Sequence, residues 1–144
     1  EELDLALLFE DVQAILNPLY EENNGKITIP IEDEFYIYGD YNRLKQVLVN
    51  IIKNSLEAKN KSTINVNIRI KKIKNSYKIT ITDNGRGMTK NELLHIHEMF
   101  YTTKQNGSGI GVPFNKEIIN LHKGNISYKS QKNKGTMVTI ILPI

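Results

Sequence analysis

Lys78 to Met88 reads Lys-Ile-Thr-Ile-Thr-Asp-Asn-Gly-Arg-Gly-Met, and its first half alternates apolar and polar residues. This alternation predicts a half-buried β-strand that ends at Asp83, where a turn with Gly85 and Gly87 begins. A carboxylate at a strand end beside glycine backbone can accept from an exocyclic amine while a flat ring lies against the main chain. Asp-Asn-Gly is also ordinary β-turn chemistry, so the stretch alone leaves both a plain turn and a base-binding site open.

The composition indicates one globular domain. The 144 residues are 40% hydrophobic and 24% charged and include no cysteine, which excludes a disulfide framework and a thiolate metal site. No apolar run approaches the roughly 20 residues that span a bilayer. The acidic start of the chain does not resemble a signal peptide. Because the chain lacks an initiator Met, we expect a fragment of a longer protein.

The net charge of +3 hides an uneven distribution. Residues 1–39 hold ten acidic residues and one basic residue, whereas residues 40–144 hold six acidic and eighteen basic residues. A basic segment can attract nucleic acid, phosphates or an acidic protein. Aromatic stacking platforms and DNA-binding motifs are not found in the sequence, so we do not expect nucleic acid as a partner.

The order of the predicted elements indicates an α+β fold. Apolar residues at helical spacing predict helices over residues 3–21, 41–56, 89–97 and about 109–122. Alternating stretches predict strands over residues 26–31, 35–38, 62–73, 77–82, 125–130 and 137–142. We therefore expect a two-layer α/β sandwich, in which a mixed, mostly antiparallel sheet of about five strands is covered on one face by three helices.

Several local signals refine these helices. We expect Pro18 to bend or shorten the first helix, and Asp40 to cap the second. Thr89 with Glu92 three residues later forms a capping box. In the last helix we place Ile118, Ile119 and Leu121 on the core face and Gly124 at the C-cap.

Two further polar sites accompany Asp83. Asn50 and Asn54 are four residues apart and share one helix face, where their amide oxygens suit a hard cation; a satisfied polar edge is the alternative. Residues 107–111, Gly-Ser-Gly-Ile-Gly, open a predicted helix, where free N–H groups and the helix dipole favour phosphate. The loop fits neither the dinucleotide fingerprint nor a P-loop. Together the three sites indicate adenine, metal and triphosphate.

These motifs follow one another in a familiar order. Residues 40–54 match an N box, residues 83–88 a first glycine box, residues 98–104 an F box, residues 107–111 a second glycine box, and Gly135-Thr136 a terminal strand. Over nearly its whole length the chain resembles the catalytic ATP-binding domain of bacterial sensor histidine kinases. The wider superfamily includes gyrase, heat-shock chaperone and mismatch-repair ATPases. Asn-x-x-Glu-Ala and Phe-Tyr-Thr-Thr-Lys resemble the nitrogen-sensing and sporulation-type kinases.

The resemblance implies a Bergerat-type ATP-binding fold and a role for each matched residue. Asp83 would accept from the adenine amine, with Thr136 nearby through water. Asn54 would be the principal Mg²⁺ ligand, and Asn50 would assist metal or phosphates. Residues 89–108 would form a mobile lid, and Asn50 and Lys104 would be the catalytic residues. The other expected ATP contacts are Gly85, Gly87, Met88, Thr102, Thr103, Gly107, Ser108, Gly109, Ile110 and Gly111.

The chain departs from the family pattern at a few positions. Glu57 stands where many members have Lys, and His97 and Met99 replace an aromatic residue and a Pro in the F box. His95, His97 and His122 fit an acceptor box poorly. The family's acceptor histidine lies on a separate, N-terminal dimerisation domain. We therefore expect residues 1–144 to be one catalytic domain, without that acceptor domain.

The implied function is transfer of the γ-phosphoryl group of Mg-ATP to that separate histidine, in two-component signalling with a response regulator downstream. One alternative is an ATP-hydrolysing clamp, but such enzymes carry Glu at the position of Asn50. Another is a non-catalytic nucleotide-sensing scaffold. We expect a cytoplasmic domain that is monomeric when isolated, and a homodimeric parent kinase whose membrane anchoring stays open.

Overall fold

The computed structural model describes residues 1–29, 33–59, 63–98 and 111–144. No helix in these ranges is long and apolar enough to cross a membrane. The elements in chain order are β1 (Glu2–Asp4), α1 (Leu5–Glu22), β2 (Gly25–Thr28), β3 (Tyr36–Tyr38), α2 (Tyr41–Glu57), β4 (Ile64–Ile73), β5 (Ser76–Asp83), α3 (Lys90–His95), α4 (Gly111–Leu121), β6 (Asn125–Gln131) and β7 (Gly135–Pro143).

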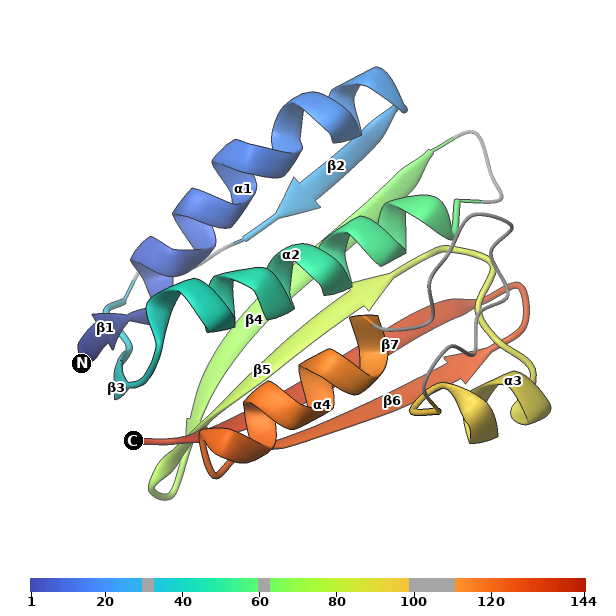
Figure 1. Cartoon of the computed structure of the whole chain (residues 1–144). Helices are drawn as coiled ribbons and strands as arrows, with labels where there is room; N and C mark the ends of the chain where they lie inside the picture. Colours follow the sequence, from blue (N-terminus) through green and yellow to red (C-terminus); the bar gives the residue numbers. More distant parts are fainter. Residues whose placement is uncertain (30–32, 60–62, 99–110) are drawn as a thin grey trace.

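The main sheet has five strands in the order β2-β4-β5-β7-β6 (Figure 1). β2 runs parallel to β4, and the other neighbouring pairs are antiparallel. On one face of this sheet lie α1, α2 and α4 (Figure 1). The predicted two-layer α+β sandwich with a mixed, mostly antiparallel sheet is therefore confirmed.

A second, two-stranded sheet pairs β1 with β3. The sequence predicted a strand at β3 but read β1 as the start of the first helix. Asp4 ends β1 and caps α1 instead, because its carboxylate accepts from the backbone N–H of Ala6 at 3.0 Å. The side chain of Leu3 is buried in both readings, so its apolar character does not distinguish a strand from a helix.

The alternation of β5 determines where its last residue lies. Tyr77, Ile79 and Ile81 are buried, and Asp83 follows them at the same two-residue period. The carboxylate of Asp83 therefore lies on the face of the sheet that the helices cover. The fully buried side chains of this core include Leu8, Phe9, Val12, Val47, Ile52, Ile64, Val66, Ile68 and Ile140.

Pro18 does not shorten the first helix, although shortening was one of the two effects expected from the sequence. α1 continues through Pro18 to Glu22. The turn beyond the proline is held by packing, since Leu16 and Tyr20 are buried and the Tyr20 hydroxyl donates to the backbone oxygen of Ile52 in α2. Tertiary contacts outweigh the missing N–H of the proline.

The end of α4 corrects two further expectations. Ile118 and Ile119 are buried as predicted, but Leu121 is 62% exposed, because successive residues of an α-helix are rotated by about 100° and this rotation turns Leu121 away from the face that the two isoleucines share. The left-handed residue after the helix is Lys123, with φ 60°, rather than Gly124. Gly124 is needed for space instead, since a Cβ there would lie 2.4 Å from the backbone oxygen of Ile141.

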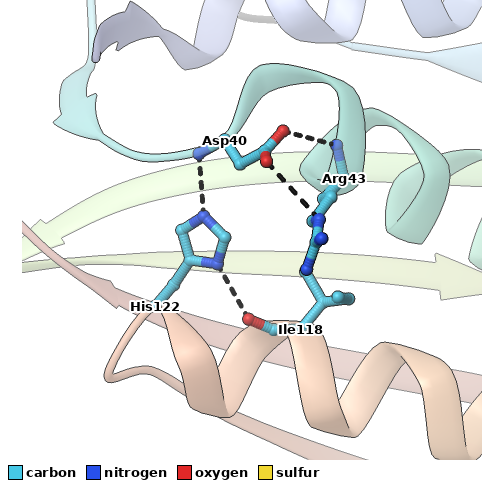
Figure 2. Close-up of polar contacts among 4 residues, drawn as sticks. All are labelled: Asp40, Arg43, Ile118 and His122. Atoms are coloured by element: carbon cyan, nitrogen blue, oxygen red, sulfur yellow. Dashed lines mark hydrogen bonds and ion pairs between the residues drawn. The ribbon is translucent and has the colours of Figure 1, made fainter.

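His122 joins the end of α4 to the start of α2 (Figure 2). Its Nδ1 donates to the backbone oxygen of Ile118 at 2.8 Å, which leaves Nε2 to accept from the backbone N–H of Asp40 at 2.9 Å. The Asp40 carboxylate caps α2 as predicted and accepts from the backbone N–H of Arg43 at 3.1 Å. Gly39 leaves room for the imidazole, because a Cβ there would lie 2.9 Å from Nε2.

This contact predicts that Gly39→Ala and His122→Ala have non-additive effects on stability. Gly39→Ala displaces the ring and loses its hydrogen bond to Asp40, so we expect a loss of about 1 kcal/mol in the free energy of unfolding. In a His122→Ala background the same change should cost much less. Denaturant unfolding of the two single variants and the double variant measures this coupling, and additive losses would contradict it.

Candidate functional site

The Asp83 carboxylate forms the centre of the candidate site. It is 8% exposed. Its Oδ1 accepts from the backbone N–H groups of Gly85 at 2.8 Å and Thr136 at 3.3 Å, and its Oδ2 accepts from the Ser55 hydroxyl at 2.9 Å. These donors come from the turn after β5, from β7 and from α2. A carboxylate has about four acceptor positions, and the described residues fill three of them, so one remains for a donor from outside these ranges.

Burial raises the pKa of the Asp83 carboxyl above its ordinary value, while the hydrogen bonds from Gly85, Ser55 and Thr136 act in the opposite direction. Burial disfavours the ionised form, and each donated hydrogen bond favours it. Ser55 also reaches the backbone oxygen of Ile51 at 3.3 Å, so its hydroxyl has an alternative acceptor. Ser55 was not singled out from the sequence, although a serine inside the apolar stripe of α2 was a visible signal.

The glycines beside Asp83 are required by the chain's own packing. A Cβ on Gly85 would lie 2.8 Å from the backbone oxygen of Ala58. Gly87 has φ +67°, and a Cβ there would lie 1.9 Å from the backbone oxygen of Gln131. Met88 donates its N–H to the Ser130 hydroxyl at 2.8 Å. These contacts fix the turn after β5 against the β6–β7 hairpin, and the ligand contacts expected for Gly85, Gly87 and Met88 remain predictions.

Asn50 and Asn54 lie on α2, one turn apart, and both are half-buried. The Oδ1 of Asn50 accepts from the Gln46 amide at 2.8 Å, and its Nδ2 donates to the Asn115 amide oxygen at 3.3 Å. Among the described residues, no three His, Cys, Asp or Glu side chains come together as metal ligands. Any hard cation held here would therefore meet amide oxygens rather than a cage of carboxylates.

The chain from residue 39 to residue 144 matches the family of histidine kinase-, DNA gyrase B- and HSP90-like ATPases. This chain belongs to that family. Sporulation kinase B of Bacillus subtilis is 36% identical over 99% of this chain, and sporulation kinase A of the same species is 38% identical over 99%. The chain spans 33% and 24% of those two relatives, and 36% of the sensor protein DegM of a Bacillus species.

Solved structures share the fold of this ATPase-family domain. The catalytic domain of histidine kinase ThkA, in a nucleotide-free form, has a TM-score of 0.87 with 24% identity, covering 99% of this chain and 94% of that one. The mycobacterial sensor histidine kinase MprB has a TM-score of 0.85 with 21% identity, covering 99% and 96%. The sequence-based resemblance to histidine kinase catalytic domains is thus confirmed.

The residues expected to contact phosphate lie largely outside the described ranges. Gly111 begins α4, with Pro113 in its first turn as predicted, and a Cβ on Gly111 would meet open space. Residues 99–110 are not described, and this range holds Met99, Thr102, Thr103, Lys104, Gly107, Ser108, Gly109, Ile110 and the second half of the expected lid. The described part of that lid contains α3, whose N-terminal capping box of Thr89 and Glu92 is present as predicted.

Two of the residues that depart from the family pattern, Glu57 and His97, lie in the described ranges. Glu57 is exposed at the end of α2. His97 packs edge-on against Tyr128, with ring centroids 5.4 Å apart, and burial together with the charge of Lys116 lowers the pKa of its imidazole. His95 contacts the Glu98 carboxylate through Nδ1 at 2.8 Å.

We predict that Asp83→Asn weakens ATP binding without unfolding the domain. An Asn side chain can still accept from Gly85 and Thr136, and Ser55 can turn its hydroxyl to Ile51 and accept from the new amide. The acceptor left for an outside donor is lost, which should cost about 1.5–3 kcal/mol of binding free energy. Calorimetric titration with ATP tests this, with Asp11→Asn on the exposed face of α1 as the control.

The difference in unfolding free energy between wild type and Asp83→Asn should depend on pH, and denaturant unfolding at several pH values measures it. Because the folded-state pKa of Asp83 is raised above 3.8, the native protein binds more protons than the unfolded chain between the two values. Wild type should therefore lose stability relative to Asp83→Asn as pH rises through that interval.

For the ATP-binding prediction, equal ATP affinities of wild type and Asp83→Asn in the calorimetric titration would contradict the adenine assignment.

Proposed function

We propose that this chain is the catalytic domain of a sensor histidine kinase, which binds Mg-ATP and passes its γ-phosphoryl group to a histidine on a separate dimerisation domain. The observation that carries the proposal is the buried Asp83 carboxylate with one acceptor position left, beside a helix that presents Asn50 and Asn54. Membership of the ATPase family and the sporulation kinases among its relatives support it.

At the base end, the free acceptor position of Asp83 selects adenine over guanine. The exocyclic amine of adenine donates to the carboxylate. Guanine presents a carbonyl oxygen at the equivalent ring position, and two acceptors facing each other in a buried place repel. The backbone N–H of Thr136 is already taken by Asp83, which leaves its side-chain hydroxyl, 2.9 Å from the Ser130 hydroxyl, to hold a bridging water.

At the phosphate end, the residues fit a magnesium ion. Mg²⁺ commonly takes only one or two protein oxygens and completes its shell with waters and substrate phosphates. The amide oxygens of Asn54 and Asn50 supply such ligands. When bound, Mg²⁺ neutralises charge on the β- and γ-phosphates. The N-terminus of α4, which Gly111 begins, favours the phosphates, and Lys104 with the backbone of residues 107–111 completes their binding in this proposal.

The transfer step then depends on placing an acceptor imidazole in line. A lone pair on its nitrogen forms the N–P bond while the bond from the γ-phosphorus to the β,γ-bridging oxygen breaks. ADP leaves with that electron pair, and the imidazole proton is released to solvent. Asn50 is an amide that takes up no proton at neutral pH, and the side chains it hydrogen-bonds, Gln46 and Asn115, are also amides. This arrangement favours transfer over the hydrolytic alternative.

A groove along α4 suits the acceptor domain. It encloses about 390 Å³ and is lined by His97, Pro113, Lys116, Glu117, Asn120 and Leu121. Leu121 is 62% exposed, which leaves apolar surface for a docking helix. We further propose that a response regulator receives the phosphoryl group in turn. The isolated domain is then a cytoplasmic monomer, and the parent kinase is a homodimer.

We predict that the domain alone is not phosphorylated on histidine. Each imidazole is engaged by its own chain: His95 by Glu98, His97 by Tyr128, and His122 by two backbone groups. Incubation with labelled ATP should give no acid-labile label until the acceptor domain of the parent kinase is added as a separate chain. Asp83→Asn serves as the control without transfer. Phosphohistidine at position 95, 97 or 122 in the isolated domain would sink the idea.

Asn50→Glu should raise basal ATP hydrolysis, because a carboxylate at this position could accept a proton from attacking water. A positioned general base contributes about 10²–10⁴-fold at best, and a grafted one should give less. Phosphate release at saturating Mg-ATP measures the effect, with binding checked separately and Asn50→Gln as the control. If Asn50→Glu binds ATP like wild type and hydrolyses no faster, the missing base is not what limits hydrolysis.

A further inference from the structure

Asn115 is a polar side chain in a place that suits an apolar one. It lies on α4 with 0% exposure, close in sequence to the core residues Ile118 and Ile119. Its Nδ2 atom has no hydrogen-bond partner among the described residues. A buried amide with an unpaired donor is unfavourable, whereas a leucine of similar shape carries no such penalty. The position therefore requires a reason other than packing.

The other end of Asn115 contacts the candidate metal site. Its Oδ1 accepts from Asn50 Nδ2 at 3.3 Å, which links α4 to α2. At the opposite end of Asn50, Gln46 Nε2 donates to Oδ1 at 2.8 Å. Asn50 is thus held by an acceptor at its nitrogen and a donor at its oxygen. Because the two ends of an asparagine amide are nearly the same shape, only such hydrogen bonds decide which end faces which way.

Further half-buried polar side chains, Tyr128 on β6 and His97 at the start of the F-box region, follow Asn115 on the side away from Asn50. Burial raises the pKa of Tyr128 to about 12. The nearby Asn115 amide lowers this pKa somewhat, but the Tyr128 hydroxyl and the Asn115 amide are not positioned to form a hydrogen bond. The ring of Tyr128 in turn packs edge-on against His97. The Tyr128 hydroxyl and His97 Nδ1, like Asn115 Nδ2, are buried without a hydrogen-bond partner in the described ranges. A row of polar groups thus runs from Asn50 beneath α4.

We propose that Asn115 is a positioning residue for the cation: by accepting from Asn50 Nδ2, it keeps Asn50 Oδ1 available to the ion. The inference rests on the proposed function. An amide turned by 180° would present N–H donors to a cation, which repel it. With Asn115 in place, one lone pair of Asn50 Oδ1 faces Gln46, and the second remains for the ion.

The test separates metal coupling from folding and from nucleotide binding itself. ATP affinity is measured by calorimetry in EDTA and again in saturating Mg²⁺, and the ratio of the two affinities is the magnesium gain. Asn115→Leu should leave the affinity in EDTA and the melting temperature unchanged, or raise the latter. It should reduce the magnesium gain about tenfold, the low end for residues that orient metal ligands.

Two further variants sharpen the result. Asn115→Asp keeps an oxygen that accepts from Asn50 and should retain most of the magnesium gain. Asn125→Leu, at an exposed asparagine that begins β6, is the matched control and should behave like wild type. Should Asn115→Leu fail to fold, Asn115→Ser takes its place, since its short hydroxyl does not reach Asn50 and the gain should again fall.

Each outcome decides the question. A wild-type gain in Asn115→Leu, or in Asn115→Ser where Leu does not fold, overturns the inference while leaving the proposed function intact. An Asn115→Leu protein that folds but melts well below wild type assigns Asn115 a structural role and also overturns it. A wild-type protein that binds no ATP removes the proposed function, and the inference fails with it. A reduced gain with unchanged affinity in EDTA supports the positioning role.

Discussion

The buried carboxylate of Asp83 constrains more of this molecule than any other single group. Removing a charge from water costs several kcal/mol unless donors replace the lost hydration. Three donors do so here, from the turn after β5, from Ser55 on α2 and from Thr136 on β7. The strand register pairs Asp83 with Thr136, and α2 lies over the sheet. Both arrangements therefore supply hydrogen-bond donors to the Asp83 carboxylate. Gly135 allows this approach, because a Cβ there would lie 2.0 Å from the Asp83 backbone oxygen.

What the sequence predicted well was local. The two-residue period predicted the strand that ends at Asp83, and the N-caps Asp40 and Thr89 were recognisable because capping depends on residues within one turn. The five strands of the main sheet and the three helices above it followed from the same periodicities. The ligand roles proposed for Asn50 and Asn54 rest on their amide oxygens and on the family resemblance, and their position on one face of α2 came from their spacing.

The missed features depend on contacts between distant segments. Ser55 and Asn115 make their contacts with the site only when α2 meets β5 and α4, at separations of 28 and 65 residues. β1 was missed because three residues carry too little pattern to separate a strand from a helix end. Leu121 was assigned to the core from its apolar character, although the helical turn carries it to the surface. For Ser55 and Asn115 the deciding information lies in the tertiary fold rather than in the neighbouring residues.

The sheet order also has a consequence for synthesis. β7 follows β6 in the chain but lies between β5 and β6 in the sheet. While the ribosome is still making β7, β5 has β4 on one side only and β6 has no partner strand, so both expose unpaired backbone groups. One of the three hydrogen bonds to the Asp83 carboxylate, the one from Thr136, is likewise missing until that residue emerges. We expect the nascent domain to be most prone to aggregation and chaperone capture in this interval, and to acquire its nucleotide site in a single late event.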